Sequence, residues 1–124
     1  MKRGCLVTVT LPGDYGKPTP ALVVQSDFFE AHPSLTVLPI SSDLIPAPLC
    51  RITVGPSEST GLTKSSQIMV DKVQTVSKKR IGKVIGSVDD TALLEVNRAL
   101  AVFLGIVWFI HSRPQCWDRT QGGD

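Results

Sequence analysis

The chain has 124 residues, of which 42% are hydrophobic and 19% are charged, and its formal net charge is +2. This length suits one domain with a modest core, and the composition excludes a disordered chain and a membrane protein. The small net charge allows an anionic partner without demanding one, because nucleic-acid binding is usually marked by a concentrated basic face.

The first part of the chain alternates short apolar runs with loops. Residues 4–11 are β-branched and partly alternating, which predicts a strand. A loop over 12–20 leads to a short buried strand over 21–25, followed by Ser26 as the cap of a turn. Residues 35–40 predict a further strand, in which Pro39 indicates an edge or a bulge.

The middle of the chain continues this pattern. A loop that begins at Ser41 precedes a strand over 49–54. After a turn, residues 65–71 predict a strand that residues 73–76 continue, and a short segment with flanking glycines covers 81–85.

The pattern becomes helical at Asp89. Carboxylates at 89 and 90 suit the positive end of a helix dipole, and apolar residues then recur at helical spacing, at Leu93, Leu94, Val96, Leu100, Ala101 and Leu104. Short strands closed by one helix predict a mainly β (α+β) fold, a small half-open barrel. This predicted domain covers residues 1–107. We interpret residues 108–124, which have no periodicity, as a disordered tail or one derived from read-through or cloning.

Location and cofactors are predicted by exclusion. The three cysteines have no metal-site spacing and leave one unpaired, which favours a reduced, cytoplasmic protein: Cys5, Cys50 and Cys116. The start lacks a long apolar core, which argues against a signal peptide. His32 and His111 offer no catalytic or metal-binding pattern, so we expect no metal and no cofactor.

The order of short motifs closely resembles the MazF/PemK family, the toxins of bacterial toxin–antitoxin pairs. The resemblance covers about residues 1–107. Its motifs are GKPTPALVVQSD at 16–27, TVLPISS at 36–42, RITV at 51–54, TGL at 60–62, VD at 70–71, QTV at 74–76 and IGKVIG at 81–86.

The resemblance implies an SH3-like barrel that forms a homodimer and cuts single-stranded RNA at specific sequences without a metal. The 2′-hydroxyl would attack the adjacent phosphate and leave a cyclic phosphate and a 5′-hydroxyl. A cognate antitoxin would cover the RNA groove with an acidic segment, and DNA would be contacted only through that antitoxin.

Catalytic residues are carried over on the same motifs. Family members usually place an arginine before the PALVV-type strand, and Thr19 stands at that position here. Threonine donates one neutral hydrogen bond and cannot neutralise a developing dianion, so the chain is either attenuated or uses another cation, with Lys17 the first candidate. Ser41 matches a phosphate-binding hydroxyl, with turn capping as the alternative. Asp71 matches an acidic groove position and is the candidate base, with a structural pairing to Lys72 or to a backbone amide as the alternative.

Further RNA contacts are predicted around these positions. Asp14, Tyr15 and Lys17 share one loop, in which the tyrosine could stack on a base, and Ser42 adjoins Ser41. Arg51 is as suited to the barrel wall as to RNA. Lys78 and Lys79 lead a basic cluster that either follows the RNA backbone or guards a strand edge.

Two other functions fit the sequence. One is a gyrase-inhibiting toxin like the related CcdB proteins, whose C-terminal Trp-Gly-Ile end has only a partial counterpart in residues 104–108. The other is a catalytically silent module that binds an antitoxin.

Overall fold

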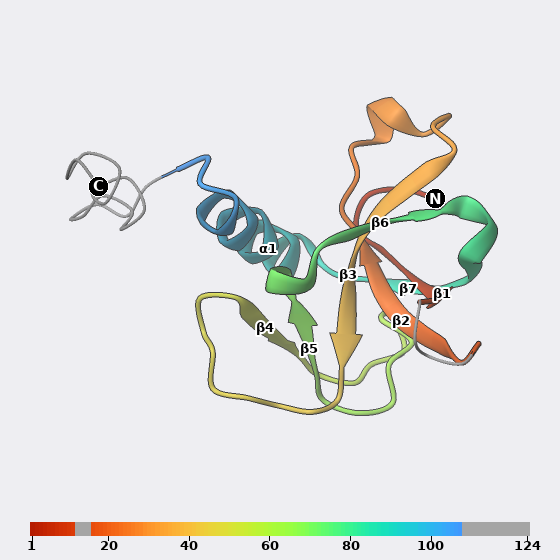
Figure 1. Cartoon of the computed structure of the whole chain (residues 1–124). Coiled ribbons are helices and arrows are strands. Elements are labelled where there is room, and N and C mark those ends of the chain that lie inside the picture. The colour runs from red at the N-terminus through yellow and green to blue at the C-terminus, as the bar shows by residue number, and fades with distance from the viewer. Residues whose placement is uncertain (12–15, 108–124) are drawn as a thin grey trace, which may run out of the picture.

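The structure, a computed structural model, describes residues 1–11 and 16–107. Within these residues the chain forms one antiparallel sheet, three short 3-10 helices and one C-terminal α-helix (Figure 1). The strands are β1 Cys5–Thr10, β2 Pro18–Val23, β3 Ser34–Ser41, β4 Arg51–Val54, β5 Ser66–Met69, β6 Gln74–Ser77 and β7 Ile81–Ser87. The helices are η1 Asp27–Phe29, η2 Val70–Lys72, η3 Lys78–Arg80 and α1 Asp90–Phe103.

The strands are arranged as the half-open barrel that the sequence predicted. Their order is β4-β5-β3-β2-β1-β7, and β6 pairs with β3. The predicted continuation of the strand at 65–71 was wrong, because η2 separates β5 from β6 and the two strands pair with different ends of β3.

The sequence misplaced Pro39, which lies in the central strand and not at an edge. Residues 34–37 of β3 pair with β6, and Ile40 and Ser41 pair with β5. Pro39 therefore falls where β3 changes partner on one side, while Ala21 of β2 pairs with it on the other. Proline has no N–H to donate, and it is tolerated here because neither β6 nor β5 pairs with β3 at Pro39.

The strand β2 begins earlier than expected and includes Thr19 and two prolines. Pro18 pairs with Thr10 and Pro20 with Thr8, whereas pairing with β3 begins only at Ala21. Because β2 has one strand partner over this stretch, its prolines do not interrupt a ladder on both sides. Thr19 is consequently fixed in a strand and not in a loop.

Strand alternation divides the apolar residues between two clusters. Leu6, Leu22 and Leu38 face the cluster that α1 covers, where Val96 is fully buried. Val7, Val9 and Val23 face the second cluster. The predicted helix begins as expected, since the Asp89 carboxylate accepts a hydrogen bond of 2.8 Å from the N–H of Ala92.

The loop between β4 and β5 packs against β7 and narrows the opening of the barrel. Gly61 has a φ of 75°, and a Cβ at this position would lie 2.2 Å from the carbonyl oxygen of Ile85. The N–H of Ser87 donates to the carbonyl oxygen of Ser59 at 2.9 Å. Only glycine satisfies both the backbone conformation and this close approach, and Leu62 then enters the core.

Two further findings concern the ends and the surface. No helix among the described residues is long and apolar enough to cross a membrane. The predicted tail over 108–124 lies outside the described residues, as do Asp14 and Tyr15.

Candidate functional site

A polar groove of about 440 Å³ lies between the start of β2, the end of β3 and the β4–β5 loop. We call it the β2–β3 groove. Among the described residues, its lining comprises five hydroxyl side chains and two lysines and lacks a carboxylate; the lining residues are Lys17, Pro18, Thr19, Pro20, Ile40, Ser41, Ser42, Leu62, Thr63, Lys64 and Ser66. Four of the predicted site residues therefore share one surface: Lys17, Thr19, Ser41 and Ser42.

The sheet register explains why Thr19 and Ser41 meet. Ala21 pairs with Pro39, and the same register continued by two residues sets Thr19 opposite Ser41. Both side chains are half-buried. Because alternate residues of a strand share a face, the two hydroxyls belong to the same face of the sheet.

The Ser41 hydroxyl makes the turn-capping contact that the sequence offered as one of two alternatives. Its Oγ accepts a hydrogen bond of 3.0 Å from the N–H of Asp43, which is turn capping. A serine hydroxyl also has one hydrogen to donate. The cap therefore holds the oxygen in place and leaves the O–H available for an anion in the groove.

The loop after Ser41 is held by Gln67, which the sequence did not single out. Gln67 pairs with Ser41 across β3 and β5 and is 7% exposed. Its side-chain oxygen accepts from the N–H of Ile45 at 2.9 Å, and its Nε2 donates to the Ile45 carbonyl at 2.8 Å. A buried side-chain amide thus closes the β3–β4 loop next to the groove; the periodicity of the sequence shows Gln67 only as a polar residue in a strand.

Arg51 and Asp71 form an ion pair and are not among the residues that line the groove. Arg51 Nε donates to one carboxylate oxygen at 2.8 Å and its terminal nitrogen donates to the other at 3.2 Å. The hydrogen bond from Arg51 is the main reason that the pKa of Asp71 lies below its ordinary value, and the same contact raises the pKa of Arg51. The ion-pair partner of Asp71 is therefore Arg51 and not the neighbouring Lys72, which was considered from the sequence.

The basic cluster at η3 is partly engaged by the protein itself. The Lys78 ammonium donates to the carbonyl of Glu30, and its N–H donates to the carbonyl of Pro33 at 3.0 Å. Arg80 reaches the carbonyl of Thr10 at 3.4 Å. Lys79 is exposed. Thr10 pairs with Pro18, which lines the groove. Of this cluster, Arg80 therefore contacts a strand residue next to the groove.

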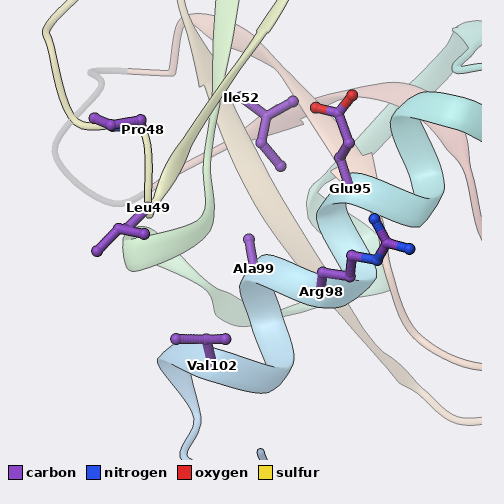
Figure 2. Close-up of a pocket in the computed structure, with 7 residues that line it drawn as sticks. All are labelled: Pro48, Leu49, Ile52, Glu95, Arg98, Ala99 and Val102. Atoms are coloured by element: carbon purple, nitrogen blue, oxygen red, sulfur yellow. The ribbon is translucent and has the colours of Figure 1, made fainter. Parts of the chain in front are cut away.

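A second, apolar pocket of about 260 Å³ separates the β3–β4 loop from α1. Figure 2 shows Pro48 and Leu49 on the loop side, across from the side chains of α1. The remaining lining residues are Ile52, Glu95, Arg98, Ala99 and Val102. Leu49 is 63% exposed.

The described residues contain no group of three His, Cys, Asp or Glu side chains that could hold a metal ion. The chemistry that the β2–β3 groove can supply is therefore hydrogen bonding from hydroxyls and positive charge from two ammonium groups. This combination suits a phosphate group, whose oxygens accept hydrogen bonds and carry negative charge.

Comparisons with known proteins point to one family. A model of the PemK-like, MazF-like toxins of type II toxin–antitoxin systems matches residues 2–104. The chain is 42% identical over 107 residues to a probable endoribonuclease MazF of Mycolicibacterium smegmatis, which covers 86% of this chain and 98% of that protein.

Solved structures agree on the fold. A mycobacterial endoribonuclease in complex with its cognate antitoxin superposes with a TM-score of 0.73 at 24% identity, over 88% of this chain and 99% of that one. The Mycobacterium tuberculosis toxin MazF-mt6 gives a TM-score of 0.72 at 20% identity, over 84% and 99%.

Proposed function

The chain belongs to the PemK-like, MazF-like endoribonuclease toxins of type II toxin–antitoxin systems, and on this premise we propose that it binds and cuts single-stranded RNA in the β2–β3 groove. The observation that carries the proposal is the convergence of Thr19, Ser41 and Ser42 with two lysines. An RNA phosphate meets hydrogen-bond donors and positive charge there.

The reaction that fits is transfer of the phosphate to the neighbouring 2′-oxygen. The 2′-oxygen bonds to phosphorus as the bond to the 5′-oxygen breaks, and the 2′-proton leaves to a base while the 5′-oxygen gains a proton. We assign to the Ser41 O–H a hydrogen bond to a non-bridging oxygen, whose negative charge rises in the transition state; the lining of the groove by Ser41 supports this role. No metal ion is needed for this step.

The reaction also requires a base that takes the 2′-proton. Asp71 stays a candidate from the sequence, but its carboxylate is held by two hydrogen bonds from Arg51 and its pKa is lowered. A base works best when its pKa lies near the working pH. The geometry therefore favours a structural role for Asp71, in which it fixes the Arg51 side chain against the sheet.

Thr19 makes this chain an attenuated member of the family. It occupies the groove at the position for which the resemblance implies an arginine. A threonine offers one neutral donor, whereas a guanidinium offers a charged pair of donors that matches phosphate oxygens. The loss of one such donor typically costs about 2.7–4 kcal/mol in the transition state, or roughly a hundred- to thousandfold in rate.

The first test compares the chain with its Thr19→Arg variant on a mixed single-stranded RNA in the presence of a chelator. We expect slow cleavage by the chain and cleavage about a hundred- to thousandfold faster by the variant. Thr53→Arg adds the same charge to an exposed position of β4 outside the groove, and this control should cut like the unmodified chain.

Each outcome of this test is decisive. Equal rates for the Thr19→Arg variant and the unmodified chain would refute the account of Thr19. Absence of cleavage by both would refute ribonuclease activity in this chain. Binding to gyrase, or to an antitoxin alone, would then be measured.

A cognate antitoxin is the protein partner that we propose, as in the mycobacterial complex that shares this fold. An acidic segment of the antitoxin would occupy the β2–β3 groove, where Lys17 and Lys64 supply the opposite charge. Contact with DNA would come through the antitoxin, and the site of action is the cytoplasm. Competition between a purified antitoxin and RNA for the toxin tests this overlap directly.

We propose that two copies of the chain pair through the apolar pocket beside α1. The helix ends at Phe103, and its C-terminal end points away from the sheet (Figure 1). Four exposed apolar side chains lie at this end or just after it: Phe103, Leu104, Ile106 and Val107. Glu95 and Arg98 of the same helix both line the pocket. In a dimer with a twofold axis, Glu95 of one copy can face Arg98 of the other, and Arg98 of the first copy then faces Glu95 of the second. These opposite charges are therefore self-complementary.

Reversing the charges of Glu95 and Arg98 tests this interface. Glu95→Arg and Arg98→Glu should each weaken the dimer, and the double variant should restore it, as measured by sedimentation. Single variants that dimerise like the unmodified chain would exclude this surface.

A further inference from the structure

The structure points to Lys64 as the cation that contacts the RNA phosphate in the β2–β3 groove, and we propose this role on the basis of the function proposed above. Two ammonium groups line the groove, one from each of two segments. Lys17 precedes β2, and Lys64 comes from the loop between β4 and β5. The hydroxyls of Thr19 and Ser41 lie on the strands β2 and β3 of the same groove.

Lys64 is carried by a backbone segment that is fixed at both ends. Two residues before it, Leu62 is 9% exposed in the core, and its N–H donates to the Thr60 hydroxyl at 3.2 Å. Two residues after it, Ser66 is 5% exposed at the start of β5. The Ser66 hydroxyl donates to the carbonyl oxygen of Lys64 itself at 2.9 Å.

The close contact of Gly61 with β7 fixes the same loop from a third side. The φ of 75° and the approach of the Ile85 carbonyl leave no space for a side chain at Gly61. The path of residues 61–66 is therefore determined by the core, by β7 and by β5 together. A charge delivered from a fixed backbone loses less conformational entropy when it binds its target.

Lys17 has a different setting. Like Lys64 it is exposed, but it follows Gly16, whose φ is 79°, before β2 begins at Pro18. Its backbone is fixed on the strand side alone among the described residues. We assign to it a weaker contribution, which is general attraction of the RNA backbone.

A lysine at position 64 suits the chemistry that Thr19 leaves incomplete. An ammonium supplies a full positive charge and up to three donors, although it lacks the planar fork of a guanidinium. Charge on the phosphate increases as the 2′-oxygen attacks, so a cation beside it stabilises the transition state more than the bound substrate. Lys64 therefore acts on the cleavage step, and its contribution should decrease when an arginine stands at position 19.

The test measures single-turnover cleavage and RNA binding for Lys64→Gln, Lys64→Arg and Lys17→Gln. Binding uses an RNA with a 2′-deoxy nucleotide at the cleavage site, which cannot react. Lys2→Gln, at an exposed position before β1 and outside the groove, is the matched control. Each variant is introduced into the chain and into its Thr19→Arg form, and equal melting temperatures confirm that all of them fold.

We expect Lys64→Gln to slow cleavage about a hundredfold, and Lys64→Arg to restore most of the rate. For Lys64→Gln, the slope of the log binding constant against log salt concentration should become less steep by about 0.7, the amount for one single-strand phosphate contact. In the Thr19→Arg form the same substitution should cost less than about tenfold, because two groups that serve one phosphate are not additive. Lys17→Gln should change binding more than the cleavage rate.

Two results overturn the proposal in different ways. If the unmodified chain cuts RNA and Lys64→Gln cuts it equally fast with the same salt slope, Lys64 has no such role and the proposed function stands. If neither the chain nor its Thr19→Arg form cuts RNA, the proposed function fails and the role of Lys64 fails with it.

Discussion

The β2–β3 groove and the Arg51–Asp71 pair both contain residues that the motifs marked as functional, yet their environments differ. In the pair, each charge is matched by the other through two hydrogen bonds. In the groove, two lysines lie among hydroxyls, and no carboxylate is found among the described residues that line it. A charge that the protein already neutralises contributes to the fold, whereas charges gathered without a counter-charge are suited to a ligand. Substitutions in the two regions should therefore change different observables.

The largest expected effect belongs to the groove. Ser41→Ala removes the only hydrogen that this side chain can donate, and we expect cleavage to slow about a hundredfold. Stability should fall by only about 1 kcal/mol, because the turn loses one cap. Kinetics and thermal melting of the same preparation separate the two quantities. Ser65→Ala, at an exposed position before β5, should change neither.

Next in size is the effect of breaking the ion pair. Asp71→Asn leaves the guanidinium of Arg51, whose side chain is 10% exposed, without its counter-charge. We expect the free energy of unfolding to fall by about 2 kcal/mol, the range for hydrogen bonds to charged groups. The cleavage rate of the folded variant should stay close to that of the unmodified chain. A large loss of rate at unchanged RNA affinity would show instead that Asp71 is the base.

Lowering the pH should weaken the Arg51–Asp71 pair reversibly, and by a smaller amount than the substitution does. Because Arg51 lowers the pKa of Asp71 in the folded state, the pair stabilises the fold fully above the ordinary value of 3.8. This contribution disappears as the pH falls through the lower, folded-state pKa. The difference in melting temperature between the chain and Asp71→Asn should therefore shrink as the pH is lowered from about 7 to about 3. A difference that grows in acid would contradict this assignment.

The smallest effect is expected at the basic cluster. Lys79→Gln removes an exposed charge from η3, and binding should weaken about twofold to threefold for every RNA sequence. Cleavage of the bound RNA should proceed at an unchanged rate. Titration of several RNAs at two salt concentrations measures this, and a change in sequence preference would place Lys79 at the bases.

The sequence predicted the fold more fully than the site. Apolar alternation located β1 and β3, and the helical spacing after Asp89 located α1 to within one residue at its start. Pro39 was misread because a proline in a strand usually indicates an edge, and only the sheet shows that β3 changes partner beside it. Lys64 and Gln67 were missed because their roles depend on contacts between segments that are distant along the chain.

The sequence by itself determined the family, the barrel and the absence of an arginine at position 19, because these depend on the order and identity of residues along the chain. The tertiary structure decided which polar residues act together. Thr19 and Ser41 share a groove through the β2–β3 register, and Lys64 joins them because Gly61 lets its loop pack against β7. Asp71 of η2 is matched by Arg51 of β4. Such pairings are set by strand register and close packing, and no local pattern of residues specifies them.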